Sequence, residues 1–139
     1  MKRTNLQNTK FWWLVKNTNI TELQKMALVR QYTAGRTQKS SEMKEEEMEM
    51  LLWNLRQLWE SMNRMRRKIF VQIAKIKLSD EKITEQQALG YIHKIVGLNI
   101  PKREKLNDYT KEELSQILNK LDAIAPKQQV KYRKNLKLV

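Results

Sequence analysis

Residues 64–68 read Arg-Met-Arg-Arg-Lys, and this basic run is the stretch whose side chains could most readily do chemistry. Arginine and lysine bind phosphate oxygens, and arginine can do so with two parallel hydrogen bonds. If the run is helical, Arg64, Arg67 and Lys68 lie within one turn on a common side, away from Met65. That side could contact neighbouring phosphates along a duplex. The alternative is a solvated helix face that pairs with nearby acids.

A second basic cluster lies at residues 127–134, where a tyrosine is interleaved with the cations. It can act as a flexible arm along a nucleic-acid backbone, or it can be a simple tail. The candidate nucleic-acid-binding residues are Arg64, Arg66, Arg67, Lys68, Lys127, Lys131, Arg133 and Lys134. Neither cluster contains a zinc finger or an RNA-recognition aromatic pair, so we expect contacts with phosphates rather than base readout.

The net charge of +13 over 139 residues supports a polyanionic partner. Positive charge is concentrated in residues 1–41, 61–79 and 127–139, whereas residues 42–60 are acidic. Such a field attracts nucleic acid and makes binding dependent on salt. We therefore predict nucleic acid as the partner, in the form of duplex DNA. An acidic protein partner, or a charge that only aids solubility, are the alternatives.

Catalysis has little support in this sequence. There is one histidine, His93, and there are no cysteines. No metal-ligand spacing or glycine-rich phosphate loop is present. The carboxylates at positions 45–49 follow one another along a helix start, so they point around the helix and suit its positive end. We predict no enzyme activity, no cofactor and no metal.

The element that must position the basic run is a helix over residues 43–78. Its apolar residues recur in steps of three and four, the pattern of an amphipathic helix. They are Met48, Leu51, Leu52, Leu55, Leu58, Trp59, Met62, Met65, Ile69, Ile73 and Ile76. An unbroken helix of this length would measure about 54 Å, which exceeds the width of a small domain. We therefore expect a bend near residues 61–64, or two helices end to end.

Shorter helices are predicted on both sides of this central element. The first covers residues 6–16, with Phe11 and Leu14 on its inner side. Capping boxes begin further helices at Thr21, Thr84 and Thr110, each followed by Gln or Glu three residues later. Glycines at 35 and 97 end two of these helices, and Pro126 is expected to end the last near residue 124.

This pattern predicts an all-α fold of about six helices in two similar lobes joined by the central helix. We place the N-terminal lobe at residues 1–60, the C-terminal lobe at 61–126 and a basic tail at 127–139. Residues 20–24 and 83–87 both begin Ile-Thr-Glu, which suggests an internal duplication or a chance likeness of two capped helices.

No apolar run reaches the roughly 18 residues of a membrane span, and no signal peptide is evident. We expect a cytoplasmic protein.

The same features resemble the GemA-like family of Mu-type phage regulatory proteins. The resemblance rests on residues 32–36 (Tyr-Thr-Ala-Gly-Arg), the acid-led helix from 46 to 55, the helix ending at Gly97, and the leucine-rich helix from 109 to 121. It covers about residues 5–125. The sequence departs from the family at Phe11, Trp12 and Trp13, and the tail after Pro126 has no counterpart.

The resemblance implies a phage or prophage origin, the cytoplasm of a bacterial host, and a role in modulating gene expression. The family has no fixed set of contact residues to transfer. Our leading interpretation is a phage-type regulator that binds nucleic acid through its basic helical surface and tail. The alternative is a protein–protein adaptor without direct DNA binding. It would contact a host protein or a second copy through the methionine-rich central helix, at Met43, Met48, Met50, Met62 and Met65.

Overall fold

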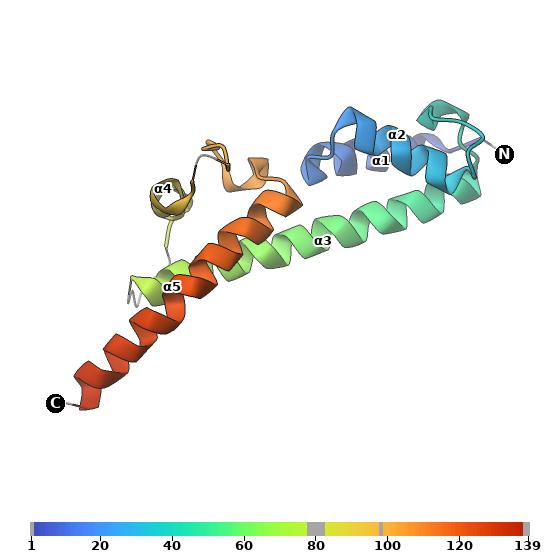
Figure 1. The fold of residues 1–139 in the computed structure, drawn as a ribbon. Helices are drawn as coiled ribbons and strands as arrows, with labels where there is room; N and C mark the ends of the chain where they lie inside the picture. The colour runs from blue at the N-terminus through green and yellow to red at the C-terminus, as the bar shows by residue number, and fades with distance from the viewer. Residues whose placement is uncertain (1, 78–82, 98, 138–139) are drawn as a thin grey trace. The chain divides into compact units, whose positions relative to one another are not determined.

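The part of the chain that the structure describes forms five α-helices and two short 3₁₀ turns (Figure 1). The computed structural model describes residues 2–77, 83–97 and 99–137, with side chains as far as residue 124. The elements are α1 (Asn5–Thr18), α2 (Glu22–Tyr32), η1 (Ser40–Glu42), α3 (Glu45–Ile76), α4 (Glu85–Ile95), η2 (Leu106–Asp108) and α5 (Lys111–Lys137). Within the described ranges there is no strand, only an isolated bridge between Lys2 and Lys44. The predicted all-α class is confirmed.

The chain divides into two compact units, Met1–Met62 and Asn63–Val139. Helix α3 supplies residues to both, and its bounds include residues 61–64. The alternative of two helices end to end is therefore wrong. Serine and asparagine at this point lower helix propensity by only some tenths of a kcal/mol each. The buried Met62 and Ile69 on either side maintain the core-facing pattern.

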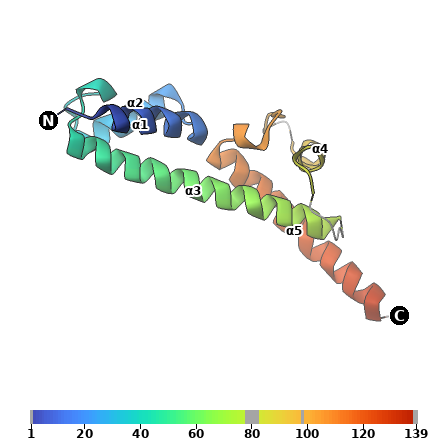
Figure 2. The same ribbon diagram turned by 180° about the vertical axis from the view of Figure 1, so that it is seen from behind.

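The first unit packs α1 and α2 against the N-terminal part of α3, an arrangement visible from both sides (Figures 1 and 2). Its core is formed by Phe11, Leu14, Val29, Met43, Met48, Leu51, Leu52 and Leu55. Met43, Met48 and Met62 are fully buried. Three of the five methionines in the proposed contact face are therefore interior residues and are not available to a partner.

The second unit packs the C-terminal part of α3 with α4, η2 and α5. Its buried apolar residues are Ile69, Ile73, Ile76, Ala88, Leu89, Ile92, Ile100, Leu106, Tyr109, Leu114, Ile117 and Leu121. Each helix contributes residues spaced three or four apart, which is the spacing that keeps one side of a helix in the core.

The two units repeat one local plan. In each, a capped helix of 11 residues leads through a loop to a three-residue 3₁₀ turn and then to an acid-led helix. The turn is followed by a fully buried residue, Met43 in the first unit and Tyr109 in the second. Both residues have extended backbone angles, with φ of −72° and −76°. The likeness noticed in the sequence thus extends to the order and local geometry of the elements.

All three predicted capping boxes are formed. The side-chain oxygens of Thr21, Thr84 and Thr110 accept main-chain N–H groups three residues later at 3.1–3.2 Å. A fourth box, between Thr4 and Gln7, begins α1 and was not predicted. The Gln7 side chain also donates to the Glu45 carbonyl at 3.1 Å, so this cap ties α1 to α3.

Helix α5 corrects the prediction for the C-terminus. We expected Pro126 to end the helix near residue 124, with a separate tail over 127–139, but α5 continues to Lys137. Proline removes one main-chain donor and crowds the preceding turn, at a cost of about 3 kcal/mol. The residues after it, Lys127, Gln128 and Gln129, are good helix formers that favour continuation.

Candidate nucleic-acid interface

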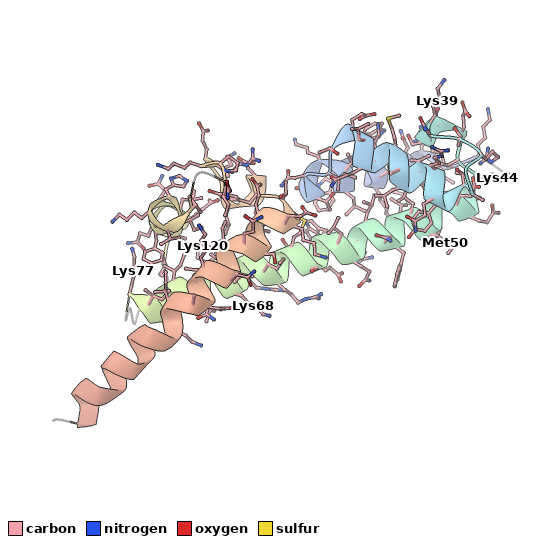
Figure 3. The ribbon with its side chains drawn as sticks, in the orientation of Figure 1. Lys39, Lys44, Met50, Lys68, Lys77 and Lys120 are labelled. Carbon is pink, nitrogen blue, oxygen red and sulfur yellow. The ribbon has the colours of Figure 1, made fainter. Side chains whose placement is uncertain are left out.

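A stripe of cations follows α3 in the second unit. Arg64, Arg67, Lys68 and Lys75 are all exposed, and their spacing of three, one and seven residues keeps them on adjoining sides of the helix. Lys68 extends from α3 into solvent in Figure 3. The sequence prediction named the first three of these residues, and Lys75 extends the stripe by two turns.

These four cations line a groove of about 610 Å³ between α3 and α5. The α5 side contributes Ser115, Leu118, Asn119 and Asp122. Gln72 donates to the Asp122 carboxylate at 2.9 Å, so the only acidic residue of the lining is held by a neutral partner. Four cations and one carboxylate leave the groove with a formal charge of +3. Such a groove attracts phosphate groups.

Arg66 is not part of this surface, which corrects its inclusion among the candidate contacts. Its side chain is 7% exposed, and its guanidinium donates to Asn63 Oδ1 at 2.8 Å and to the Asn107 carbonyl at 3.5 Å. Burial lowers the pKa of Arg66 from its ordinary value. The spacing explains the burial, because Met62, Arg66, Ile69, Ile73 and Ile76 follow steps of four and three along the core-facing side of α3.

The other four predicted contacts lie on the last part of α5. The backbone at Lys127, Lys131, Arg133 and Lys134 belongs to the helix, and their side chains lie outside the described part of the structure. This cluster therefore belongs to a helix and not to the flexible arm considered from the sequence.

A second basic cavity lies in the first unit and was missed in the sequence. It has a volume of about 800 Å³, and its charged lining residues are Arg3, Glu22, Lys25, Arg30, Arg36, Lys39 and Glu42. Five cations and two carboxylates again give a formal charge of +3. Lys25 pairs with Glu22 at 2.8 Å, and Arg36 pairs with Glu47. The contributing residues are scattered over the first 42 positions, so no local run revealed them.

The acidic start of α3 has a structural role. The Glu47 carboxylate accepts the main-chain N–H of Lys44 at 2.8 Å and also pairs with Arg36. The hydrogen bond from the Lys44 main chain, followed by the contacts with Arg36, lowers the pKa of Glu47 below 4.5. Glu47 therefore fastens the preceding loop to the beginning of α3.

A third groove, with a volume of about 770 Å³, lies between α1 and α3 in the first unit and differs in character from the two basic cavities. Its apolar lining residues are Leu6, Trp13, Leu14, Leu52, Trp53 and Trp59. Trp13 and Trp59 contact each other edge to face, with ring centroids 5.1 Å apart. Trp12 is 47% exposed and lines the basic cavity of this unit, with the Lys25 ammonium over its ring.

The single histidine of the sequence makes a structural contact. His93 Nε2 lies 3.0 Å from the Arg103 carbonyl, a contact that joins α4 to the following loop. No group of three or more metal-binding side chains occurs among the described residues. In the same part of the chain, no helix combines the length and apolar character that crossing a membrane requires.

Comparison with known proteins leaves this site to be interpreted from its own geometry. No protein-family model, curated protein or solved structure matches the chain.

Proposed function

We propose that the protein binds nucleic acid through the phosphate backbone and that the α3–α5 groove of the second unit is the main contact. The observation that carries this proposal is the exposed stripe of Arg64, Arg67, Lys68 and Lys75 along a groove of charge +3. None of these four residues has a carboxylate partner among the ion pairs of the described residues. Their charges therefore remain available to a ligand.

The length of the stripe suits a nucleic-acid backbone. Positions 64 and 75 are separated by 11 residues, or about 16 Å along the helix axis. This distance corresponds to about five steps of 3.4 Å along one strand of a duplex. Four side chains with rotatable stems can reach successive phosphates over that length. Arginine and lysine side chains along a helix suit contacts with phosphates, so sequence-independent contact with duplex DNA is the simplest form of the proposal.

A role in modulating gene expression completes the proposal. It rests on the resemblance of the helix pattern to GemA-like phage regulators. Binding to the phosphate backbone would hold such a regulator on DNA. A second component bound to the regulator or to the DNA would then supply the preference for a target sequence. The competing adaptor function loses support in its original form, because Met43, Met48 and Met62 are buried.

Fluorescence anisotropy with a random-sequence DNA duplex at several salt concentrations tests the proposal. The triple variant Arg64→Ala, Arg67→Ala, Lys68→Ala removes three groove cations. Each lost phosphate contact should make the slope of log affinity against log salt less steep by about 0.9, or about 2.7 for all three. The matched control is Lys94→Ala, Lys102→Ala, Lys111→Ala. It removes the same charge from exposed positions of the same unit that do not line the groove.

The two triple variants separate a localised site from diffuse attraction. A large change in slope for the groove variant and a small change for the control would support the groove. Equal losses in both would show that net charge, rather than this groove, governs binding. Failure of the wild-type protein to bind at low salt would refute the nucleic-acid proposal.

A further inference from the structure

The groove between α1 and α3 of the first unit, which we call the aromatic groove, leaves large apolar side chains exposed to solvent. Leu6, Trp13 and Trp53 are 65%, 49% and 66% exposed, although tryptophan and leucine gain most from burial. Met50, which is 63% exposed and labelled in Figure 3, lies one turn before Trp53 on α3. Contiguous apolar surface of this kind marks a contact with another macromolecule.

The charge of the groove excludes a polyanion as its natural occupant. Its charged lining residues are Lys10, Glu45, Glu49 and Arg56, which sum to zero. The α3–α5 groove, by contrast, carries +3. Exposed tryptophans can stack on bases, but nucleic-acid sites combine such platforms with an excess of positive charge. A protein surface fits a neutral aromatic groove better, because tryptophan and arginine are enriched at the centres of protein interfaces.

Glu49 and Arg56 place opposite charges at two points along the α3 side of the groove. Gln7 donates to the Glu49 carboxylate at 3.2 Å, which places Glu49 at the beginning of α1. Arg56 follows seven residues later on α3, about 10.5 Å along its axis, and forms an exposed ion pair with Glu60 at 3.5 Å that it would have to exchange for a partner's carboxylate. The midpoint between these two positions falls beside Leu52 and Trp53, the apolar centre of the patch.

We propose that this groove is a homodimer interface in which two copies of the chain pack antiparallel about a two-fold axis beside Trp53. The axis would bring Glu49 of one protomer to the partner's Arg56, and Arg56 to the partner's Glu49. Trp53 would enter the partner's groove near the centre. A surface that is complementary to itself after a half-turn is what an isologous dimer requires. The proposal is independent of the nucleic-acid proposal, since its residues belong to the first unit only.

Sedimentation equilibrium of the full chain over about a hundredfold concentration range tests this assignment. The wild-type protein should show a reversible dimer, and Trp53→Ser should weaken it at least tenfold. Leu23→Ser is the matched control. Leu23 is 77% exposed in the same unit and does not line the groove, so this variant should dimerise like the wild type. Circular dichroism should show unchanged helicity in both variants, because neither side chain is buried.

A charge swap tests the antiparallel arrangement. Glu49→Lys and Arg56→Glu should each weaken the dimer, because each brings like charges together twice across the axis. The double variant Glu49→Lys, Arg56→Glu should restore the dimer towards wild-type affinity. A wild-type chain that stays monomeric throughout the range, a Trp53→Ser variant that dimerises normally, or a double variant no tighter than the singles would each overturn the proposal.

Discussion

Arg103 donates from Nη2 to both carboxylate oxygens of Glu113, at 3.2 and 3.1 Å. The same carboxylate accepts the main-chain N–H of Thr110 at 2.8 Å, so Glu113 joins the preceding loop to the first turn of α5. Arg36 and Glu47 have the same relationship in the first unit, where Glu47 accepts the N–H of Lys44. The repeated plan thus includes an arginine–glutamate contact at the start of each acid-led helix.

This relationship predicts unequal effects for the two partners in the second unit. Glu113→Ala should lower the free energy of unfolding by about 1–2 kcal/mol, because it removes half of a capping box together with the ion pair. Arg103→Ala should cost less, about 0.5 kcal/mol, because its side chain is 38% exposed and solvent screens the pair. Urea denaturation measures both values. Lys102→Ala, at an exposed neighbouring position, is the control and should leave stability unchanged.

Glu47 predicts a specific loss of stability in acid. Its folded-state pKa lies below 4.5 because the carboxylate accepts the Lys44 N–H and contacts Arg36. A depressed pKa stabilises the fold above the unfolded-state value, and this contribution disappears as the pH falls through the folded-state value. Glu47→Gln should therefore be less stable than the wild type at neutral pH, and the difference should narrow below pH 4.5.

Chemical denaturation at neutral and acidic pH measures this narrowing. Glu46→Gln is a suitable control, because Glu46 is an exposed neighbour in the same first turn of α3. A wild-type advantage over Glu47→Gln that stays constant down to acidic pH would contradict the assignment.

Arg66 and Arg67 are adjacent in sequence but should respond to mutation in opposite ways. Arg66→Ala should destabilise the second unit by about 1–3 kcal/mol, since it removes a buried side chain and its hydrogen bonds to Asn63 and Asn107. Arg67→Ala should leave stability within about 0.5 kcal/mol of the wild type, as expected for an exposed position. It should instead weaken DNA binding.

Thermal denaturation and duplex binding, measured on the same two preparations, separate these effects. Arg66→Met offers a further comparison, because it retains most of the packing while removing the buried charge, and should cost less than Arg66→Ala. An Arg67→Ala variant that loses stability without losing DNA affinity would exclude this residue from the interface.

Tyr109 should make the stability of the fold depend on pH in the alkaline range. Its buried hydroxyl accepts the Arg103 main-chain N–H at 3.1 Å, and burial raises the pKa of the phenol above 10. The neutral phenol is therefore favoured in the folded state, and stability should fall as the pH rises above 10. Tyr109→Phe should cost about 1 kcal/mol at neutral pH through the lost hydrogen bond. The free energy of unfolding of Tyr109→Phe should fall less steeply than that of the wild type as the pH rises above 10. Chemical denaturation of both proteins at increasing pH measures this difference.

The helical elements were predictable because their signals are local. A threonine followed three residues later by glutamine or glutamate correctly placed the starts of α2, α4 and α5. The predictions failed where one local signal competed with others. Pro126 did not end α5, and weak helix formers did not break α3 at residues 61–64.

The sites were less predictable because they depend on contacts between distant parts of the chain. A run of basic letters does not distinguish the exposed Arg67 from the buried Arg66, although the core spacing from Met62 to Ile76 contained that information. The aromatic groove combines residues from positions 4 to 59, and its lining shares no motif. Only the packing of α1 beside α3 brings Trp13 and Trp59 together.

The position of the aromatic groove along the chain has a consequence during protein synthesis. Its lining ends at Trp59, whereas the lining of the α3–α5 groove begins at Arg64 and extends to Asp122. Because a chain is made from its N-terminus and domains fold as units during synthesis, the proposed dimerisation surface emerges from the ribosome before the proposed DNA-binding surface is complete. Neighbouring ribosomes on one message would then hold nascent chains able to pair before either can bind DNA. The chains would then dimerise before they can bind DNA.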